Sequence, residues 1–447
     1  MPETTRRGAG SRQIADLTLP ALGVLAAEPL YLLFVTAVIG HLGALPLAGL
    51  AIGGLVLSES QLTFLSYGTT ARAARCFGSG DRAAAVREGI QATWLALAFG
   101  AVITIVVEAA AVPLVSMIAS RGDIVAAALP WLRLAILGAP AILVSLAGNG
   151  WMRGVQDTVR PLRYVCAGFG FSALLCPLLV YGWLGFPRLG LPGSAVADLA
   201  GEWLAALLFG RALLAEQLSL RIDHAVLRAQ LKLGRDLFVR VLAFQVCFVS
   251  AAAVAARFGT AAIAAHQVVV QLWNFLALLF DSLAIAAQAL VGAALGARDA
   301  AHAKSVTWRI AAISLLAATV LAVLLGVGEP VLPGLFIHDH SVLTTVHVPW
   351  WLLTAQLPIA GIVFGLDGVL LGAGDAKFLR NATVISAAVG FLPLIWLSLI
   401  FGWGLVGIWS GLTTFTVLRL VFVGARILSG RWLSPEPADR PPQMREL

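Results

Sequence analysis

Ionisable side chains lie inside long apolar stretches of this chain, where a charge is costly and therefore marks a candidate site for ion or proton chemistry. Glu28 and Glu202 fall near the middle of the first and sixth apolar stretches, and no basic residue shares their depth. Glu59 lies in the second stretch. We predict that Glu28, Glu202 and Glu59 line a cavity and bind a coupling cation, with Glu28, assisted by Glu202, as the proton-binding group.

A second group of charges lies in the later half of the chain. Arg240, Asp281 and Asp367 all fall in the same half of their apolar stretches, at a similar depth. We predict that they form one polar cluster. Two roles stay open for this cluster: a functional site, or a structural ion pair that locks one part of the protein.

The other intramembrane charges have plainer interpretations. Asp198 shares the sixth stretch with Glu202. Glu108, Arg133 and Arg419 are expected to lie near the ends of their stretches and to reach the membrane interface. His266 is expected to be a hydrogen-bonded contact between helices, with a proton relay as the alternative.

The amino-acid composition predicts the kind of secondary structure in which these ionisable residues lie. Hydrophobic residues make up 60% of the chain and charged residues 12%, whereas a soluble domain carries about a quarter charged residues. The chain divides into about twelve apolar stretches, each long enough to cross ~30 Å of hydrocarbon. The expected fold is an all-α integral membrane protein.

The same pattern of residues occurs twice, at a constant offset of 218 positions: Pro140, Gly150, Gly154 and Asp157 recur as Pro358, Gly368, Gly372 and Asp375. A duplicated, very apolar chain is typical of a secondary transporter. We expect two six-helix lobes related by a pseudo-two-fold axis along the membrane normal. The predicted boundaries are 1–214 for the N-lobe, 215–234 for a cytoplasmic linker with an amphipathic helix, 235–430 for the C-lobe and 431–447 for a disordered tail.

The distribution of basic residues predicts the orientation in the membrane, and the absence of known motifs excludes some classes of function. Lys and Arg concentrate in the loops on one side, and the opposite loops hold Arg121, Arg188 and Arg257. This bias predicts a multi-pass protein of the plasma (inner) membrane with both termini cytoplasmic. The net charge of +7 then reflects anionic lipid and requires no nucleic acid. No P-loop and no metal spacing is present, so we expect no enzyme activity, no metal and no cofactor, with H⁺ or Na⁺ as coupling ion, and a monomer.

Several motifs resemble those of one transporter family. They are TAVIGHLGALPLAGL (36–50), FGSGD (77–81), GNGWMRGVQDTVRP (148–161), AAHQVVVQL (264–272), ALGARD (294–299) and LDGVLLGAGDAKFLRNA (366–382). Together they resemble the multidrug and toxic compound extrusion (MATE) family, and within it the DinF-type branch. The resemblance implies two six-helix lobes forming a V and exchange of cationic or amphipathic compounds for protons or sodium ions. It also implies that Glu202, Arg240, Asp281 and Asp367 match polar positions usual in this branch.

The chain departs from that branch at two acidic positions. The branch usually has an aspartate where this chain has Val35, and an asparagine and an aspartate where it has Ser172 and Cys176. We therefore expect a cation-coupled antiporter, most simply proton-coupled, that exports amphipathic or cationic small molecules by alternating access between two lobes. The alternatives are a flippase for a lipid-linked substrate, or a degenerate transporter acting as a receptor or scaffold.

Overall fold

The computed structural model describes residues 10–59, 64–119, 121–336 and 339–433, and within them the chain forms helices and no strand. The helices of the first half are α1 (Ser11–Gly40), α2 (Ala44–Glu59), α3 (Phe64–Gly78), α4 (Arg82–Ile118), α5 (Gly122–Ala135), α6 (Ala139–Gly154), α7 (Val159–Tyr181) and α8 (Leu191–Leu214). Those of the second half are α9 (His224–Arg257), α10 (Thr260–Gly296), α11 (Ala300–Gly328), α12 (Leu332–Phe336), α13 (His340–Gly372), α14 (Ala376–Ser386), α15 (Leu392–Phe401) and α16 (Gly404–Leu428).

Length and hydropathy make this a multi-pass membrane protein. In the described part of the chain, 10 helical stretches are long and apolar enough to cross a membrane. Two of them join labelled helices: α5 continues through a 3₁₀ turn into α6, and α14 continues through a π-helical turn (Ala387–Phe391) into α15. The other two expected spans fall on α2 with α3, and on α8, whose two acids lower its hydropathy. The all-α membrane fold expected from the composition is confirmed.

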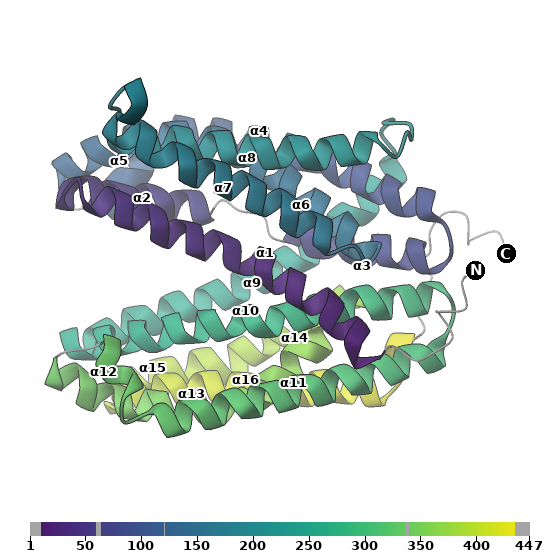
Figure 1. Cartoon of the computed structure of the whole chain (residues 1–447). Coiled ribbons are helices and arrows are strands. Elements are labelled where there is room, and N and C mark those ends of the chain that lie inside the picture. The colour runs from purple at the N-terminus through teal and green to yellow at the C-terminus, as the bar shows by residue number, and fades with distance from the viewer. Residues whose placement is uncertain (1–9, 60–63, 120, 337–338, 434–447) are drawn as a thin grey trace. The chain divides into compact units, whose positions relative to one another are not determined.

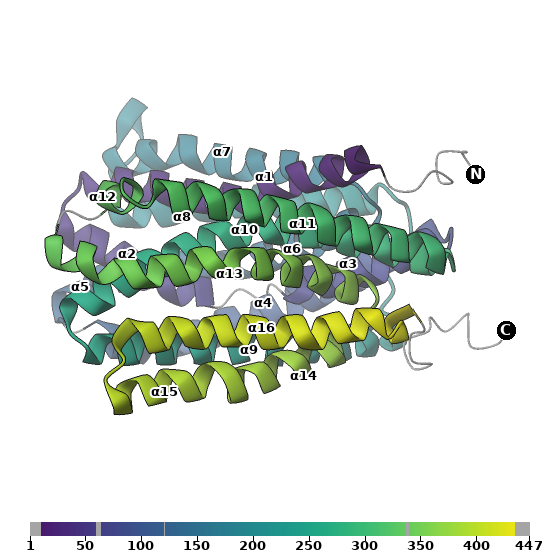
Figure 2. The ribbon, with the colours of Figure 1, turned by 90° about the horizontal axis from the view of Figure 1, so that it is seen from below.

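The chain divides into two compact units, which we call the N-unit (19–230) and the C-unit (1–18 with 231–447). Within each unit the helices run side by side along a common direction (Figures 1 and 2). Both α1 and α9 contribute to the two units, because the divisions fall after Thr18 and after Gln230, inside these helices. The predicted linker 215–234 contains no helix of its own, since its residues from His224 onward form the start of α9.

The 218-residue offset is present in the packing as well as in the sequence. A Cβ atom added to Gly150 would lie 2.7 Å from the carbonyl oxygen of Ser66, and one added to Gly368 would lie 2.2 Å from that of Ala284. Glycine at both positions lets α6 approach α3, and α13 approach α10, with backbones in direct contact. Because Ser66 and Ala284 are themselves 218 residues apart, the two units repeat this helix contact.

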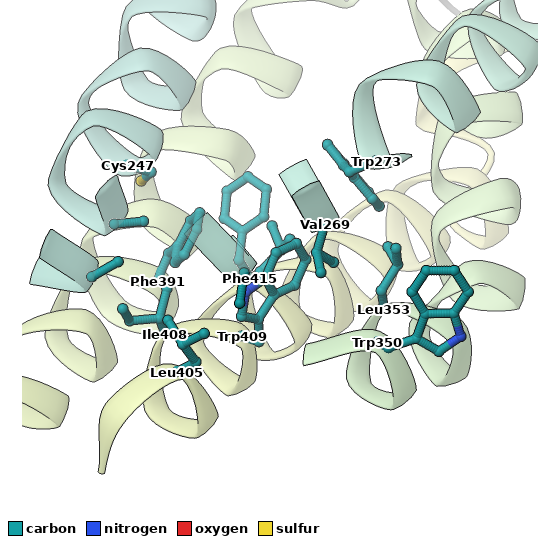
Figure 3. Packing of buried hydrophobic residues seen from close by; sticks show 14 of the residues in the cluster. Cys247, Val269, Trp273, Trp350, Leu353, Phe391, Leu405, Ile408, Trp409 and Phe415 are labelled. Atoms are coloured by element: carbon teal, nitrogen blue, oxygen red, sulfur yellow. The ribbon is translucent and has the colours of Figure 1, made fainter. Parts of the chain in front are cut away.

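Aromatic side chains fill much of the interior of the C-unit (Figure 3). Trp350 and Trp409 are each 1% exposed and pack in one apolar cluster with Trp273, Phe391 and Phe415. The indole nitrogen of Trp350 donates to the carbonyl of Leu325 at 3.0 Å, which satisfies its buried N–H. This cluster holds α10, α13 and α16 together around the charged side chains described below.

Candidate functional site

Three acidic side chains of the N-unit share one site, which we call the carboxylate cluster: Glu28, Asp198 and Glu202. Asp198 and Glu202 are four residues apart on α8 and therefore lie on the same face of that helix. Glu28 of α1 acts electrostatically on both of them, and Asp198 acts on Glu202. All three side chains are half-buried. The structure thus brings together Glu28 and Glu202, both predicted from the sequence, and adds Asp198 to them.

A tyrosine connects this cluster to the neighbouring helix. Tyr31, nearly one turn after Glu28 on α1, is 6% exposed and hydrogen-bonds to the hydroxyl of Ser172 on α7. Its side chain also hydrogen-bonds to Asp198. The ring stacks on Phe169 with centroids 5.0 Å apart, which fixes its orientation. Tyr31 therefore links a carboxylate of α8 to a hydroxyl of α7.

Two glycines allow α7 and α8 to bring these groups into contact. A Cβ on Gly201 would lie 2.5 Å from the carbonyl oxygen of Gly168, and 2.7 Å from the Cβ of Ser172. A Cβ on Gly168 would in turn meet the carbonyl oxygen of Gly201 at 2.7 Å. Close approach through small residues is a common way for membrane helices to pack. Since Gly201 precedes Glu202 directly, this contact fixes the position of the carboxylate cluster beside Ser172.

The positions at which the DinF-type branch usually carries acids are apolar and buried here. Val35 is 4% exposed and Cys176 0%, and both belong to the hydrophobic core of the N-unit. Neither faces water, and the core closes around them. The acids of the carboxylate cluster instead come from Glu28, which lies seven residues before Val35 on α1, and from α8.

The C-unit contains a different arrangement, which we call the Arg–Asp cluster: Arg240, Asp367 and Arg419. Arg240 of α9 donates from Nη2 to Oδ2 of Asp367 on α13 at 2.5 Å. Arg419 of α16 pairs with the same oxygen atom. Asp281 of α10 adds a second negative charge that acts on Arg419. Four helices of the C-unit, α9, α10, α13 and α16, therefore contribute two guanidinium and two carboxylate groups to this site.

Aromatic rings surround the Arg–Asp cluster. The guanidinium carbon of Arg419 lies 5.1 Å from the ring centre of Phe244 and 5.6 Å from that of Phe415. These distances permit cation–π attraction, which is strongest where water is excluded. Within the described residues, the Nε atoms of both arginines and Oδ1 of Asp367 are buried and make no hydrogen bond. Gly368 sets the position of Asp367 through the contact with Ala284.

The remaining predicted residues are placed as follows. Glu59 ends α2, and its side chain lies outside the described residues. His266 is 3% exposed and its ring lies 5.8 Å from that of Trp409, as a buried contact between α10 and α16. Arg419 does not reach the interface as expected, because it is 3% exposed and paired inside the C-unit.

Sequence reasoning missed three participants in these sites: Asp198 as a partner of Glu202, Arg419 as a partner of Asp367, and Tyr31. The four-residue spacing of Asp198 and Glu202 was a usable signal, since it places them on one helix face. Arg419 lies nine residues before the end of α16, about 13 Å, which is too deep for an interfacial residue. For Tyr31 the sequence carried no signal beyond an aromatic residue in an apolar helix.

Comparison with known proteins extends over both units. The MatE family model matches residues 20–178 and 237–397. Protein DETOXIFICATION 44, chloroplastic, of Arabidopsis thaliana is 33% identical over 459 residues, covering 96% of this chain and 85% of that protein. DNA damage-inducible protein F of Escherichia coli (strain K12) is 31% identical over 423 residues, covering 90% and 89%. The crystal structure of MATE in the bent conformation has a TM-score of 0.85 at 20% identity and 94% coverage of both chains.

Proposed function

This chain belongs to the MATE family of membrane transporters, as its motifs indicated, and we propose that it exports amphipathic or cationic small molecules in exchange for protons bound at the carboxylate cluster. The family and fold are those of transporters rather than enzymes. The relatives named for detoxification support a small, foreign substrate. In a bacterial cell the protein would lie in the inner membrane with both termini cytoplasmic.

The observation that carries this proposal is the grouping of Glu28, Asp198 and Glu202. The groups that act electrostatically on Glu202 are the other two acids, so their charges repel one another in a medium of low dielectric constant. Such a site is most stable when it holds a proton or another cation. Tyr31 and Ser172 provide hydroxyl groups that can pass a proton between α8 and α7.

The Arg–Asp cluster differs from the carboxylate cluster in its charge balance, and this difference supports cation exchange in the N-unit. Asp367 already accepts from two guanidinium groups, so its negative charge is neutralised by the protein itself. A transported cation would have to compete with two tethered arginines. Cation exchange is therefore proposed for the N-unit, and a structural role for the Arg–Asp cluster.

The driving force is sufficient for useful export. Inward movement of one proton charge across 100 mV releases about 2.3 kcal/mol, which supports about a 50-fold gradient of a neutral exchanged substrate. No ATP-dependent step is needed for transport of this size.

The proposal is tested by exchange in proteoliposomes that carry a fluorescent amphipathic cation and an imposed pH gradient. Glu202→Gln and Asp198→Asn should each reduce proton-driven exchange at least tenfold, and Glu28→Gln should act in the same direction. Glu329→Gln is the matched control, since Glu329 pairs with His347 outside the cluster at 2.6 Å. A sodium gradient replaces the pH gradient in a parallel set.

Each outcome of that experiment decides between functions. Exchange driven by pH and lost in the cluster variants supports the proposal. Exchange driven by sodium alone, or retained at full rate in Glu202→Gln and Asp198→Asn, rejects proton coupling at this cluster. Absence of any gradient-dependent exchange, with lipid scrambling or without it, would instead favour a flippase or a receptor.

A further inference from the structure

The chain between α7 and α8 forms a closed loop in the N-unit. Two backbone hydrogen bonds hold its base: the N–H of Leu189 donates to the carbonyl of Leu179 at 2.8 Å, and that of Gly190 donates to the carbonyl of Val180 at 3.3 Å. Residues 183–189 (WLGFPRL) lie within this base and are all exposed. In Figures 1 and 2 the chain at the end of α7 projects away from the neighbouring helices of the N-unit.

The exposed side chains of this loop are large and apolar. Trp183 is 56% exposed, Leu184 is 89% exposed and Phe186 is 42% exposed. Loops that face water are built mainly from small polar residues, glycine and proline. Large apolar side chains that are exposed together mark contact with another protein or with a membrane. The loop therefore has the surface of an interaction site.

The backbone of the loop holds these side chains outward. A 3₁₀ turn covers Trp183–Gly185, and within it Leu184 has a φ of 54° and a ψ of 29°. This left-handed conformation favours glycine or asparagine, because other side chains are strained there. Strain of this kind persists where the residue has a function. A leucine that is strained and almost fully exposed is explained by a contact that its side chain makes outside the protein fold.

The C-unit repeats the aromatic part of this arrangement at the end of the corresponding span. Residues 181–183 (YGW) end α7, and residues 401–403 (FGW) end α15. The central glycine has a φ of 75° in the first motif and 70° in the second. In each motif the two aromatic rings stack with centroids 5.3 Å apart. Tryptophan at the end of a membrane span is characteristic of the boundary between lipid and water.

The loop also continues the apolar surface of α7. On that helix Phe171 and Leu174 are 44% and 73% exposed, and their three-residue spacing places them on one face. After the aromatic residues the loop carries Arg188, which is exposed. A guanidinium group matches the phosphate of a phospholipid headgroup, and apolar side chains suit the boundary between headgroups and acyl chains. The loop thus has the composition of a segment that lies in the membrane interface.

We propose that residues 183–189, which we call the aromatic loop, bind phospholipid at the bilayer interface. Trp183, Leu184 and Phe186 enter the boundary between headgroups and acyl chains, and Arg188 contacts a headgroup phosphate. The bilayer surface is the occupant that fits best, because the loop joins the end of a membrane span and combines exposed aromatic rings with one cation.

The aromatic loop is connected to the helix that carries Glu28. Tyr181 stacks on Trp183 and donates its hydroxyl to the carbonyl of Val38, near the end of α1, at 2.6 Å. Lipid contact at the aromatic loop therefore holds this end of α1 at the membrane interface. The proposal is independent of which substrate or ion the protein exchanges.

The test measures the environment of a nitrobenzoxadiazole label on one cysteine of the full-length chain, in vesicles of phosphatidylcholine and phosphatidylglycerol. Cys166→Ala first removes the exposed native thiol, and the other three cysteines are buried. Leu184→Cys then carries the label in the aromatic loop. Gly122→Cys is the matched control at the start of α5, because Gly122 is exposed and lies between Arg121 and Asp123, which form an exposed ion pair.

The label at position 184 should report the membrane interface. Compared with the control, it should emit at shorter wavelength, be quenched about threefold less by aqueous iodide, and be quenched about threefold more by a lipid with a nitroxide near its headgroup. Phe186→Cys is a second labelling position and should give the same result.

Two further substitutions test which side chains hold the aromatic loop in the interface. Trp183→Ser should raise iodide quenching at position 184 about twofold, because it removes an interfacial side chain. Arg188→Glu should do the same, since a carboxylate repels phosphate. Arg121→Glu changes the control turn and should leave quenching at position 184 unchanged.

Three results would overturn the proposal. Iodide quenches the label at position 184 as strongly as the control, which would place the aromatic loop in water. The label is protected from iodide but is not quenched by the nitroxide lipid, which would mean that protein covers it. Neither Trp183→Ser nor Arg188→Glu changes the quenching, which would show that these side chains do not bind lipid.

Discussion

The two units carry opposite charges on corresponding helices. The first and last helices of the N-unit repeat, α1 and α8, supply the acids Glu28, Asp198 and Glu202. The first and last helices of the C-unit repeat, α9 and α16, supply the arginines Arg240 and Arg419. A duplicated architecture has therefore kept its helices in place while reversing the charge that they present. The carboxylate cluster of the N-unit needs a cation from outside the protein. In the C-unit, Arg240 and Arg419 already neutralise Asp367.

This contrast predicts opposite responses to neutralisation. Removing a carboxylate from the N-unit relieves repulsion and should affect exchange more than stability. Removing the carboxylate from the C-unit leaves two buried guanidinium groups without their shared partner and should affect stability first.

Asp367→Asn should give the largest change in stability. The substitution leaves Arg240 and Arg419 without the oxygen that both contact, and breaking a buried ion pair from one side costs about 3–5 kcal/mol. Thermal unfolding in detergent should show a clear fall in Tm. Asp123→Asn, in an exposed pair with Arg121, is the control and should leave Tm unchanged. An Asp367→Asn protein as stable as the native chain would mean that the cluster is not structural.

Substitution of the glycines that position the two sites should give the next largest loss of stability. Gly368→Ala places a Cβ 2.2 Å from a backbone oxygen of α10, and Gly201→Ala places one 2.5 Å from a backbone oxygen of α7. Overpacking of this kind costs about 1–3 kcal/mol. Gly201→Ala should also slow proton-driven exchange because it separates Glu202 from Ser172. Gly210→Ala, on the same helix α8 with open space around it, is the control and should not lower Tm.

Much of the fold followed from the sequence because its causes are local. Hydropathy located the spans, and the 218-residue offset located the repeat. The approach of Arg240 to Asp367 was foreseeable from their equal depth in two helices. The pairing of Arg419 with Asp367 was not, because it depends on how α16 rotates about its own axis when Trp409 and Phe415 pack. The hydrogen bonds of Tyr31 likewise depend on the contact between Gly168 and Gly201, which no single-sequence pattern specifies.

The turn after α6 and its counterpart in the second copy can be compared in their backbone conformation. Gln156 has a φ of 63° where the second copy has Gly374 with a φ of 70°. A non-glycine residue in the left-handed region costs about 1–2 kcal/mol relative to an ordinary conformation. Gln156→Gly should therefore raise the free energy of unfolding by up to about 1 kcal/mol, and Gly374→Ala should lower it by a similar amount. Changes of the same sign in the two variants would show that the turns are not equivalent.

The smallest predicted effect on stability is also the one that separates the two sites most sharply. Glu202→Gln removes one of two like charges at i and i+4 on α8, and such pairs destabilise a helix by about 0.2–0.5 kcal/mol. Tm near neutral pH should stay unchanged or rise slightly, while proton-driven exchange falls. Melting curves, recorded beside those of Asp367→Asn, measure both halves of the contrast. A fall in Tm for Glu202→Gln comparable to that of Asp367→Asn would show that the N-unit acids hold the fold together, and the division of roles between the units would have to be abandoned.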